Sequence, residues 1–594
     1  MKFPSLRSGF AAVLLFALIV PILAACGGAA APSTGEQATS APAQATAGSA
    51  PATGATAEAP AAAETAAPAA GESAGGKVLR IHQITTPDVV DPQKASFSSE
   101  IVLLSLNYEG LTKLDKDLKA VPAAAEKWEF SSDGTQLTFH LRDGLKYSDG
   151  SPLTAENFRY AVERTCDPKT AGEYQSILFE IVGCEDWAST AITDTAKYDA
   201  AKAALGAKAT DEKTLVLTFT KPAPYYTYIS GIWVFYPAKK ELVEKGGDNW
   251  WKDAANQIGN GPFQMTSYQE AQLVEFKANQ NYWGGKPALD GVDFVYQKET
   301  AVALEAYKSG QLDIMQPDPS QLPALKSDPD LSKELLIYPG GSTYNLAFSL
   351  AKKPFDDKKV REAFSYAIDR KTYCEQIRTD CLPTLTWIPE GIQGAIKTDK
   401  YGFDAEKAKQ ALAESSYGGP DKLPEIKLTY NADDSATQPR AEWMAGQFRD
   451  ILGVNVTLDP VEGKTLTALR KSPETHPQML FVGGWIQDYP DPQNWLSVYW
   501  TCNATFAKRF SYCNKQLDEI VAKADVELDP AKRTQLYEQA GQILIDDVPG
   551  PFIYNRTNTF LVKPFVKNIV PTTADSSSGW PGQWASQTTV DIVK

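Results

Sequence analysis

The sequence has 594 residues, of which 22% are charged and 43% are hydrophobic, and its formal net charge at pH 7 is −15. This acidic balance, without a basic stretch interleaved with aromatic residues, excludes nucleic acid as the expected partner. Residues 77–594 have a globular composition and are too many for one hydrophobic core, so two or three lobes are expected there.

The N-terminal segment has the pattern of an export signal. Lys2 and Arg7 precede the apolar run FAAVLLFALIVPILAAC, which is too short and too abruptly ended for a membrane span. The run closes on LAAC, which ends at Cys26 and resembles the lipobox whose cysteine becomes the lipidated first residue of bacterial lipoproteins. We therefore expect residues 1–26 to be a lipoprotein signal peptide. The alternative is an ordinary signal peptide in which Cys26 stands by chance.

Residues 27–76 contain only Ala, Gly, Pro, Ser, Thr, Glu and Gln. Without aromatic residues or aliphatic residues larger than Ala, this segment buries too little surface to offset the entropy of ordering. We predict a disordered tether that reaches on the order of 40 Å as a flexible coil. The lobes would then be attached to the membrane through the lipid anchor alone, because no second long apolar run follows.

Beyond the tether, strand and helix patterns alternate along the chain. Strand patterns occupy 77–84, 137–144 and 214–220, and Asp133-Gly134 marks the turn of a hairpin. Helix patterns occupy 153–164 with Thr154 as cap, 355–370 with Val360, Phe364, Ala367 and Ile368 on one face, and 528–545 with Asp529 as cap and Pro530 in the first turn. This mixture, without an internal repeat, predicts an α/β fold.

The cysteines fall into local couples once Cys26 is set aside. The couples are Cys166 with Cys184, Cys374 with Cys381, and Cys502 with Cys513. An even number of cysteines in an exported chain indicates disulfides, although six cysteines allow fifteen pairings, so local pairing is a preference and not a deduction. A metal site is the alternative. It is disfavoured because no couple has the C-x-x-C spacing and because His82, His140 and His476 lie far from the couples in sequence.

No sequence motif calls for an enzyme. The patterns G-x-S-x-G, H-E-x-x-H and G-x-x-x-x-G-K-[ST] are absent. The adjacent carboxylates Asp356–Asp357 and Asp433–Asp434 are typical of solvated turns and do not give the cross-cleft geometry of a glycosidase. We predict neither catalytic residues, nor a cofactor, nor a bound metal.

The stretch GGWIQDYPDPQNW, residues 483–495, surrounds Asp488 with aromatic residues and prolines. One interpretation is turn chemistry, in which the aspartate bonds nearby backbone and the prolines end a strand or a helix. The other is a ligand counter-ion, a carboxylate kept partly dry by aromatic walls. The stretch by itself favours the first interpretation.

Several segments resemble family 5 of the solute-binding proteins of ABC importers, the oligopeptide and dipeptide receptor group. They occur in the family's order between residues 78 and 565: YEGLTKLDKDLKAVPAAAEKWEFSSDGTQLTFHLRDGLKYSDGSPLTAENF, GNGPFQMTSY, NQNYWGGKPALDGVDF, AYKSGQLDI and KPFDDKKVREAFSYAIDR. The resemblance implies a periplasmic-binding-protein-like fold, with two main lobes and an extra smaller lobe around a ligand cleft. Lobe I would comprise 77–110, 224–343 and 553–594, lobe II 111–223, and lobe III 344–552. Chain crossings such as STYNLAF, residues 342–348, would be hinges.

The same resemblance implies ligand contacts and reverses the preference at Asp488. In peptide-binding members the Trp-x-x-Asp turn presents its aspartate to the ligand's α-ammonium group, and GGWIQDYPDP has Trp485 and Asp488 in place. The backbone of Gly484 and Trp485 would lie beside the peptide like an added strand. Further ligand contacts are expected at Phe97, Ser98, Tyr344 and Asn345.

The expected function is therefore that of an extracytoplasmic, lipid-anchored receptor that captures peptides. Its partners would be the peptide and the permease and ATPase subunits of an ABC importer, and the receptor is expected to be a monomer. We identified no Arg or Lys at a set distance from Asp488 to bind the ligand's carboxylate, so the length of the ligand stays open. A receptor of the same family for oligosaccharides or another solute is the alternative, and a secreted hydrolase is a third hypothesis.

Overall fold

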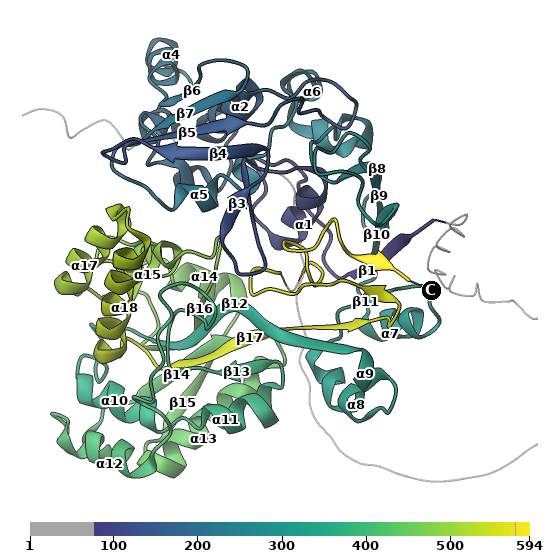
Figure 1. The fold of residues 1–594 in the computed structure, drawn as a ribbon. Helices are drawn as coiled ribbons and strands as arrows, with labels where there is room; N and C mark the ends of the chain where they lie inside the picture. The colour runs from purple at the N-terminus through teal and green to yellow at the C-terminus, as the bar shows by residue number, and fades with distance from the viewer. Residues whose placement is uncertain (1–75, 577, 594) are drawn as a thin grey trace, which may run out of the picture. The chain divides into compact units, whose positions relative to one another are not determined.

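The computed structural model describes residues 76–576 and 578–593. The predicted signal peptide 1–26, its lipidation site Cys26, and the tether up to residue 75 lie outside these described residues. Within them, no helix is both long enough and apolar enough to cross a membrane. The predicted α/β class is confirmed by a large mixed sheet, a smaller sheet and many helices (Figure 1).

The large sheet joins segments from distant parts of the chain. Parallel pairing joins the first strand to residues 291–296, whereas antiparallel pairing joins residues 335–348 to 552–562. In spatial order its strands are β15 (Val456–Val461), β14 (Ile426–Asn431), β16 (Met479–Ile486), β12 (Leu335–Phe348), β17 (Phe552–Val562), β11 (Ile314–Met315), β1 (Val78–Gln83), β10 (Gly291–Tyr296), β9 (Leu273–Ala278) and β8 (Phe263–Gln269), and β13 (Cys381–Pro383) pairs with β17.

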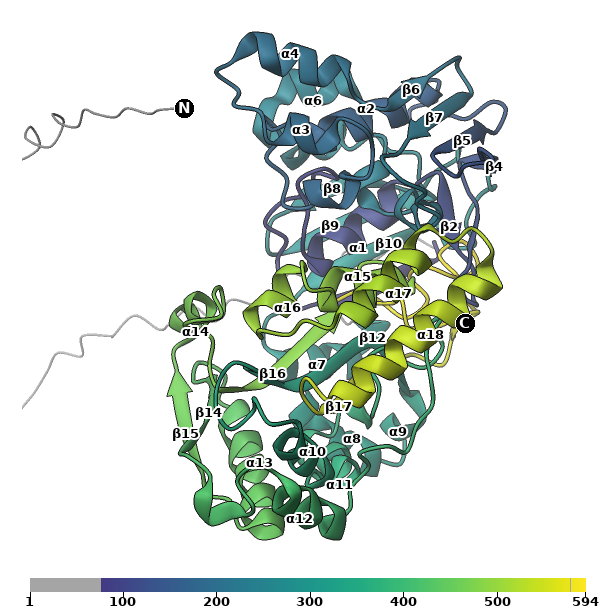
Figure 2. The same ribbon diagram turned by 90° about the vertical axis from the view of Figure 1, so that its left-hand side faces the viewer.

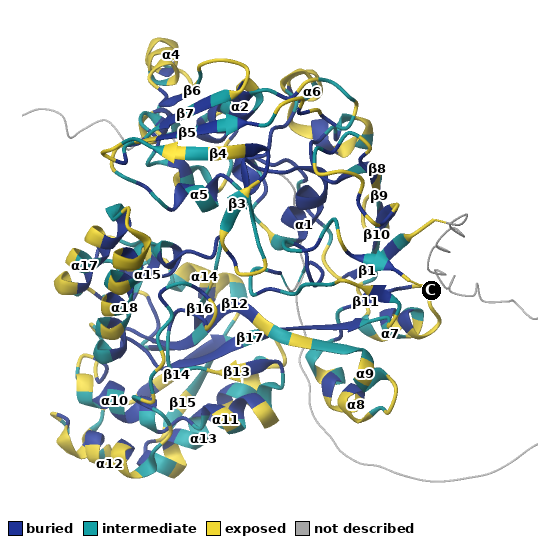
Figure 3. Ribbon diagram, in the orientation of Figure 1, coloured by how far each residue is buried: buried dark blue, intermediate teal, exposed yellow. Residues whose placement is uncertain are grey.

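The long strands β12 and β17 lie side by side through the middle of this sheet (Figure 1). Strand β17 is buried along most of its length, as its dark blue colour in Figure 3 shows. The predicted hinge segment 342–348 is the second half of β12, where the register with β17 shifts between Pro339 and Thr343 and again between Tyr344 and Asn345. The crossing is therefore an irregular strand of a continuous sheet.

The smaller sheet contains the predicted hairpin. Its strands in order are β4 (Ala125–Phe130), β5 (Gln136–Leu141), β7 (Thr214–Thr218) and β6 (Ala207–Ala209). Gly134 has φ of +69°, which suits a glycine in the turn that joins β4 to β5. The predicted helix 153–164 is α2 (Ala155–Cys166), and Asn157 Oδ1 accepts a hydrogen bond from the backbone N–H of its N-cap Thr154 at 2.8 Å. Both predictions are confirmed.

The region between 344 and 552 is rich in helices. Helices α15 (Pro492–Trp500), α17 (Lys515–Val526) and α18 (Pro530–Asp547) lie together in Figure 2. The predicted helix 528–545 is α18, and Asp529 accepts a hydrogen bond from the N–H of Lys532 as predicted for its cap. The helix predicted over 355–370 is shorter, because α10 ends at Tyr366. Ala367 and Ile368 lie past its end and are nevertheless fully buried. The helices here are α10 (Lys358–Tyr366), α11 (Arg370–Thr372), α12 (Ala405–Glu414), α13 (Thr437–Leu452), α14 (Gly463–Leu469), α15 (Pro492–Trp500), α16 (Thr505–Arg509), α17 (Lys515–Val526) and α18 (Pro530–Asp547).

The remaining elements include two short two-stranded sheets, in which β2 pairs with β3 and β18 pairs with β19. Helix α1 (Ser98–Asn107) is buried along nearly its whole length, as Figure 3 shows. The others are α3 (Cys184–Ala188), α4 (Thr195–Ala203), α5 (Tyr226–Ile229), α6 (Lys240–Gly246), α7 (Thr300–Lys308), α8 (Leu322–Ser327), α9 (Leu331–Glu334), β2 (Thr112–Leu114), β3 (Ala120–Pro122), β18 (Val566–Lys567) and β19 (Asp591–Ile592).

The hydrophobic cores do not follow the predicted lobes one to one. One buried cluster contains Ile81 of β1 together with Phe139 of β5 and Phe158 of α2, so the predicted lobes I and II share a core. Separate clusters, built around Phe364 and around Trp495, fill the region predicted as lobe III. The lobe boundaries themselves stay a prediction.

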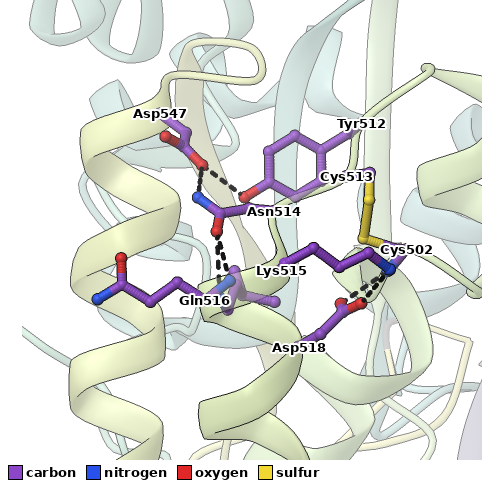
Figure 4. Close-up of a disulfide and its surroundings, with 9 residues drawn as sticks. Cys502, Tyr512, Cys513, Asn514, Lys515, Gln516, Asp518 and Asp547 are labelled. Carbon is purple, nitrogen blue, oxygen red and sulfur yellow. Dashed lines mark hydrogen bonds and ion pairs between the residues drawn. A yellow bond between two sulfur atoms is a disulfide. The ribbon is translucent and has the colours of Figure 1, made fainter.

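Three disulfides join the cysteine couples that the sequence favours: Cys166–Cys184, Cys374–Cys381 and Cys502–Cys513. Figure 4 shows the surroundings of the third. The backbone N–H of Cys502 donates to Asp518 in α17 at 2.8 Å, and Tyr512 and Asn514 both donate to Asp547, the last residue of α18. The disulfide loop is therefore anchored to both helices.

Candidate ligand-binding cavity

A cavity of about 390 Å³ lies where the predicted lobes meet. Its walls come from segments that are far apart in the sequence, including residues of β12 and β17 in the large sheet. The contributing segments are 96–114, Tyr174, 228–236, Tyr282, 340–344, 486–490, 556–558, 573–576 and 583–588.

Asp488 enters this cavity from the loop between β16 and α15. The next helix fixes the end of that loop, because Asp491 caps α15, accepts the N–H of Gln493 at 2.9 Å, and precedes Pro492 in the first turn. Asp491 is fully buried and forms a two-point ion pair with Arg533, with both N–O distances at 2.7 Å. The turn chemistry proposed for the stretch 483–495 therefore belongs to Asp491 and Pro492.

The Asp488 carboxylate has two neutral hydrogen-bond donors. Asn494 Nδ2 donates to Oδ2 and the Tyr174 hydroxyl donates to Oδ1, each at 2.9 Å. Within the described residues no Lys, Arg or His forms an ion pair with it. Burial raises the pKa of Asp488, and the hydrogen bonds from Asn494 and Tyr174 offset only part of that shift. The site is thus a partly desolvated carboxylate to which the described part of the chain offers no cation.

Tyr174 belongs to the predicted lobe II and Asp488 to lobe III, so their hydrogen bond crosses between lobes. The tyrosine ring packs edge-on against Trp233 with ring centroids 5.1 Å apart, which fixes its direction. Sequence analysis missed Tyr174 because it lies 314 residues away from its partner.

Three of the predicted contact residues do not line this cavity. The Trp485 indole N–H donates to Asn494 Oδ1 at 2.9 Å and its ring packs against Tyr499 and Phe506, so Trp485 positions Asn494. A Cβ atom added to Gly484 would lie only 2.7 Å from the carbonyl oxygen of Thr343. The glycine therefore allows β12 and β16 to pair closely here. Asn345 is 1% exposed, and its amide nitrogen donates to the Leu346 carbonyl.

Phe97, Ser98 and Tyr344 do line the cavity together with Asp488. Phe97 is the N-cap of α1 and is 57% exposed, although Glu100 accepts its backbone N–H at 3.0 Å. Ile486, at the end of β16, is 60% exposed and lines the same cavity. Two large apolar side chains are therefore available to contact a ligand.

The charged side chains that line the cavity within the described residues are Glu109, Lys113, Asp488, Arg556 and Asp575. Glu109 accepts hydrogen bonds from Tyr282 and Trp283 and lies 3.7 Å from Lys113. Burial raises the pKa of Glu109, and Lys113 is the largest of the groups that oppose the shift. Sequence reasoning singled out none of these except Asp488, since the others stand in ordinary strands and loops.

A second cavity of about 260 Å³ contains arginines. Arg378, Arg440 and Arg470 line it together with Leu480, Phe481 and Val482 of β16. Burial lowers the pKa of Arg470, Tyr499 opposes the shift, and neighbouring Arg509 adds to it. Strand β16 therefore runs from this arginine-lined cavity to the end that carries Asp488.

The sequence profile described as "Bacterial extracellular solute-binding proteins, family 5 Middle" matches residues 119–507, more than half of the chain. The chain belongs to this family. It is 29% identical over 514 residues to the oligopeptide-binding protein OppA of Bacillus subtilis (strain 168), covering 84% of this chain and 91% of that protein. It is also 29% identical over 512 residues to the probable deoxycholate-binding periplasmic protein YgiS of Escherichia coli (strain K12), covering 84% and 92%.

The fold is also that of solved family members. The unliganded open form of the periplasmic murein tripeptide binding protein MppA matches with a TM-score of 0.75 and 28% identity, over 88% of this chain and 98% of that chain. The expectation of a periplasmic-binding-protein-like fold is therefore confirmed, and these relatives are named as binding proteins.

Proposed function

We propose that this protein is an extracytoplasmic receptor that binds peptides between its lobes and delivers them to an ABC importer. The observation that carries the proposal is Asp488, a partly desolvated carboxylate whose pKa is raised and which has, among the described residues, two neutral donors and no cationic partner. A ligand ammonium group would supply the missing charge, and a charge-assisted hydrogen bond in such a place is much stronger than an exposed ion pair. Peptides carry that group at their amino terminus.

The peptide main chain would extend along β16. This strand pairs with β12 on one side, but within the described residues β14 pairs with it only at Met479 and Leu480. The outer edge of β16 beyond Leu480 is thus available for an added strand, as the sequence suggested for Gly484 and Trp485. Main-chain pairing gives affinity without reading side chains, which suits a receptor for many peptides.

The arginine-lined cavity would receive the carboxyl end of the peptide. Val482 lines the arginine-lined cavity and Asp488 lines the first cavity. The chain between these two residues spans about 20 Å when extended. We infer a ligand of about six residues, with its ammonium group at Asp488 and its carboxylate near Arg440 and Arg470. This assignment supplies the cationic partner that sequence reasoning did not find.

The membrane anchor is part of the same proposal. A lipid on Cys26 and the tether that follows would hold the receptor at the outer face of the membrane, near the permease. The oligopeptide-binding name of one relative supports a peptide ligand, whereas another relative is named as a probable deoxycholate-binding protein. An anionic ligand such as deoxycholate would meet the uncompensated charge of Asp488, which disfavours it here.

Calorimetric titration of the purified protein with hexa-alanine tests the function. We expect one peptide bound per protein molecule, and mass spectrometry should recover the peptide intact. A cleaved peptide would indicate the hydrolase that the third hypothesis describes. Absence of binding at millimolar concentrations would refute the proposal.

A further inference from the structure

Arg556 gives the first cavity a positive charge on the wall formed by β17. The residue stands in a strand that is buried at nearly every other position, yet its side chain is 34% exposed and lines the cavity. Gly340 and Gly341 of the neighbouring strand β12 line the cavity beside it, where the register between the two strands shifts. A Cβ atom at Gly340 would lie 2.9 Å from the Arg556 carbonyl oxygen, and one at Gly341 would lie 2.5 Å from the Thr573 carbonyl oxygen, so glycine allows the close backbone packing of this wall.

Arg556 shares its carboxylate partner with a second arginine. Asp380 Oδ2 lies 3.3 Å from Arg556 Nε, whereas Asp380 Oδ1 lies closer, 2.9 Å, to Arg378 Nε. The side chains of Asp380 and Arg378 are 4% and 11% exposed, and Arg378 is further held over the Tyr554 ring at 4.7 Å. One buried carboxylate therefore serves two guanidinium groups, and the more exposed of the two faces the cavity.

The other carboxylates that line the cavity are held elsewhere. Glu109 is engaged by Lys113, Tyr282 and Trp283. Asp575 accepts the backbone N–H groups of Thr572 and Gly582 at 2.9 Å and the Tyr338 hydroxyl at 3.2 Å. Asp488 is assigned to the ligand's ammonium group. The excess positive charge of the Arg378–Asp380–Arg556 group is thus left for a ligand to neutralise.

We propose that Arg556 is a carboxylate subsite that selects peptides with an acidic residue near the amino terminus. The proposal rests on the proposed function, which places the ammonium group at Asp488 in the same cavity. Strands β16 and β17 are separated only by β12, so their backbones lie about 10 Å apart, a gap that an arginine and a glutamate side chain together can span. Guanidinium groups bind carboxylates in two-point geometry, so charge and shape are both read.

The test compares amidated hexapeptides that carry Glu or Gln at position 1, 2 or 3 of an alanine background. Calorimetry on the wild type should give at least one Glu peptide that binds about ten-fold tighter than its Gln counterpart. Arg556→Gln should abolish this preference for Glu over Gln. Its affinity for hexa-alanine amide should stay within about two-fold of the wild-type value, because Asp380 keeps Arg378 as its partner. Lys113→Gln is the matched control: it removes a cation of the same cavity that has its own carboxylate, and should retain the preference.

A second arm identifies the source of the carboxylate. Tri-alanine is titrated as free acid and as amide, because the carboxyl end of a short peptide could reach Arg556 instead of the second cavity. If only the tri-alanine pair shows an affinity difference, and Arg556→Gln abolishes it, Arg556 is still a carboxylate subsite. The carboxylate it binds is then the carboxyl terminus of a short peptide. The subsite is refuted if, for the wild type, the carboxylate-bearing peptide binds no more than about three-fold tighter than its uncharged counterpart in every pair. It is also refuted if the difference in affinity persists in Arg556→Gln. If neither hexa-alanine nor its amide binds the wild type, the proposed function fails first.

Discussion

Replacing Asp488 with Asn removes one charge and retains the shape of the side chain. The carboxylate is held by two neutral donors and forms no ion pair within the described residues, so a bound ammonium group would be its sole counter-ion there. Removing one partner of such a desolvated pair costs about 2–5 kcal/mol, which is a loss of about thirty-fold or more in affinity. N-acetylation of the peptide removes the other partner and should cost the wild type a similar amount.

Calorimetry on both proteins with both forms of hexa-alanine completes a double-mutant cycle. If the two changes affect one interaction, acetylation should cost Asp488→Asn much less than it costs the wild type, with a coupling energy of about 2 kcal/mol. Glu109→Gln is the matched control, since this carboxyl group lines the same cavity but is held by Tyr282 and Trp283. Additive losses, or tight binding of the acetylated peptide by the wild type, would refute the role of Asp488.

Three further predictions concern pH, stability and anchoring. Because burial raises the pKa of Asp488, peptide affinity should fall as the pH falls through that pKa, and calorimetry on Asp488→Asn should give a flatter profile; a pH-independent wild type between pH 7.5 and 4 would contradict this. Asp293 lies opposite Glu275 in the sheet. Burial, and to a lesser extent the charge of Glu275, raises the pKa of Asp293 to about 6, so its charged form destabilises the fold above that pH. Asp293→Asn should therefore raise the free energy of unfolding by about 1 kcal/mol at pH 7.5, or the melting temperature by about 1 °C, and this gain over the wild type should vanish toward pH 4. A difference in melting temperature between variant and wild type that is the same at both pH values would count against it. Cys26→Ser should move the protein from the membrane to the soluble fraction and abolish palmitate labelling, and unchanged fractionation would disprove lipidation at this residue.

Local sequence signals predicted the elements well where the determining contacts are local. Thr154 and Asp529 begin their helices as predicted, and Asp133-Gly134 forms the hairpin turn. The helix predicted over 355–370 was too long, because Ala367 and Ile368 are buried as part of the core beyond the helix end at Tyr366. Spacing of apolar residues reports burial, and burial does not require that the helix continue.

The candidate site was predictable only where the family resemblance carries it. The resemblance pointed to Asp488, and Phe97, Ser98 and Tyr344 line the same cavity, but the partner Tyr174 lies 314 residues from Asp488 and could not be inferred from spacing. Arg556 stands in a strand whose residues are mostly buried, and nothing in the local pattern indicates that its side chain is 34% exposed. The side chains of Asn345 and Trp485 donate to the Leu346 carbonyl and to Asn494, contacts that the sequence did not indicate, and their expected ligand contacts stay a prediction.

The most direct test of the account is a crystal structure of the protein with hexa-alanine bound. We expect the peptide's ammonium nitrogen about 2.8 Å from the Asp488 carboxylate, and the peptide main chain paired with the outer edge of β16. An amino terminus bound elsewhere, with Asp488 still contacting only Asn494 and Tyr174, would contradict the account.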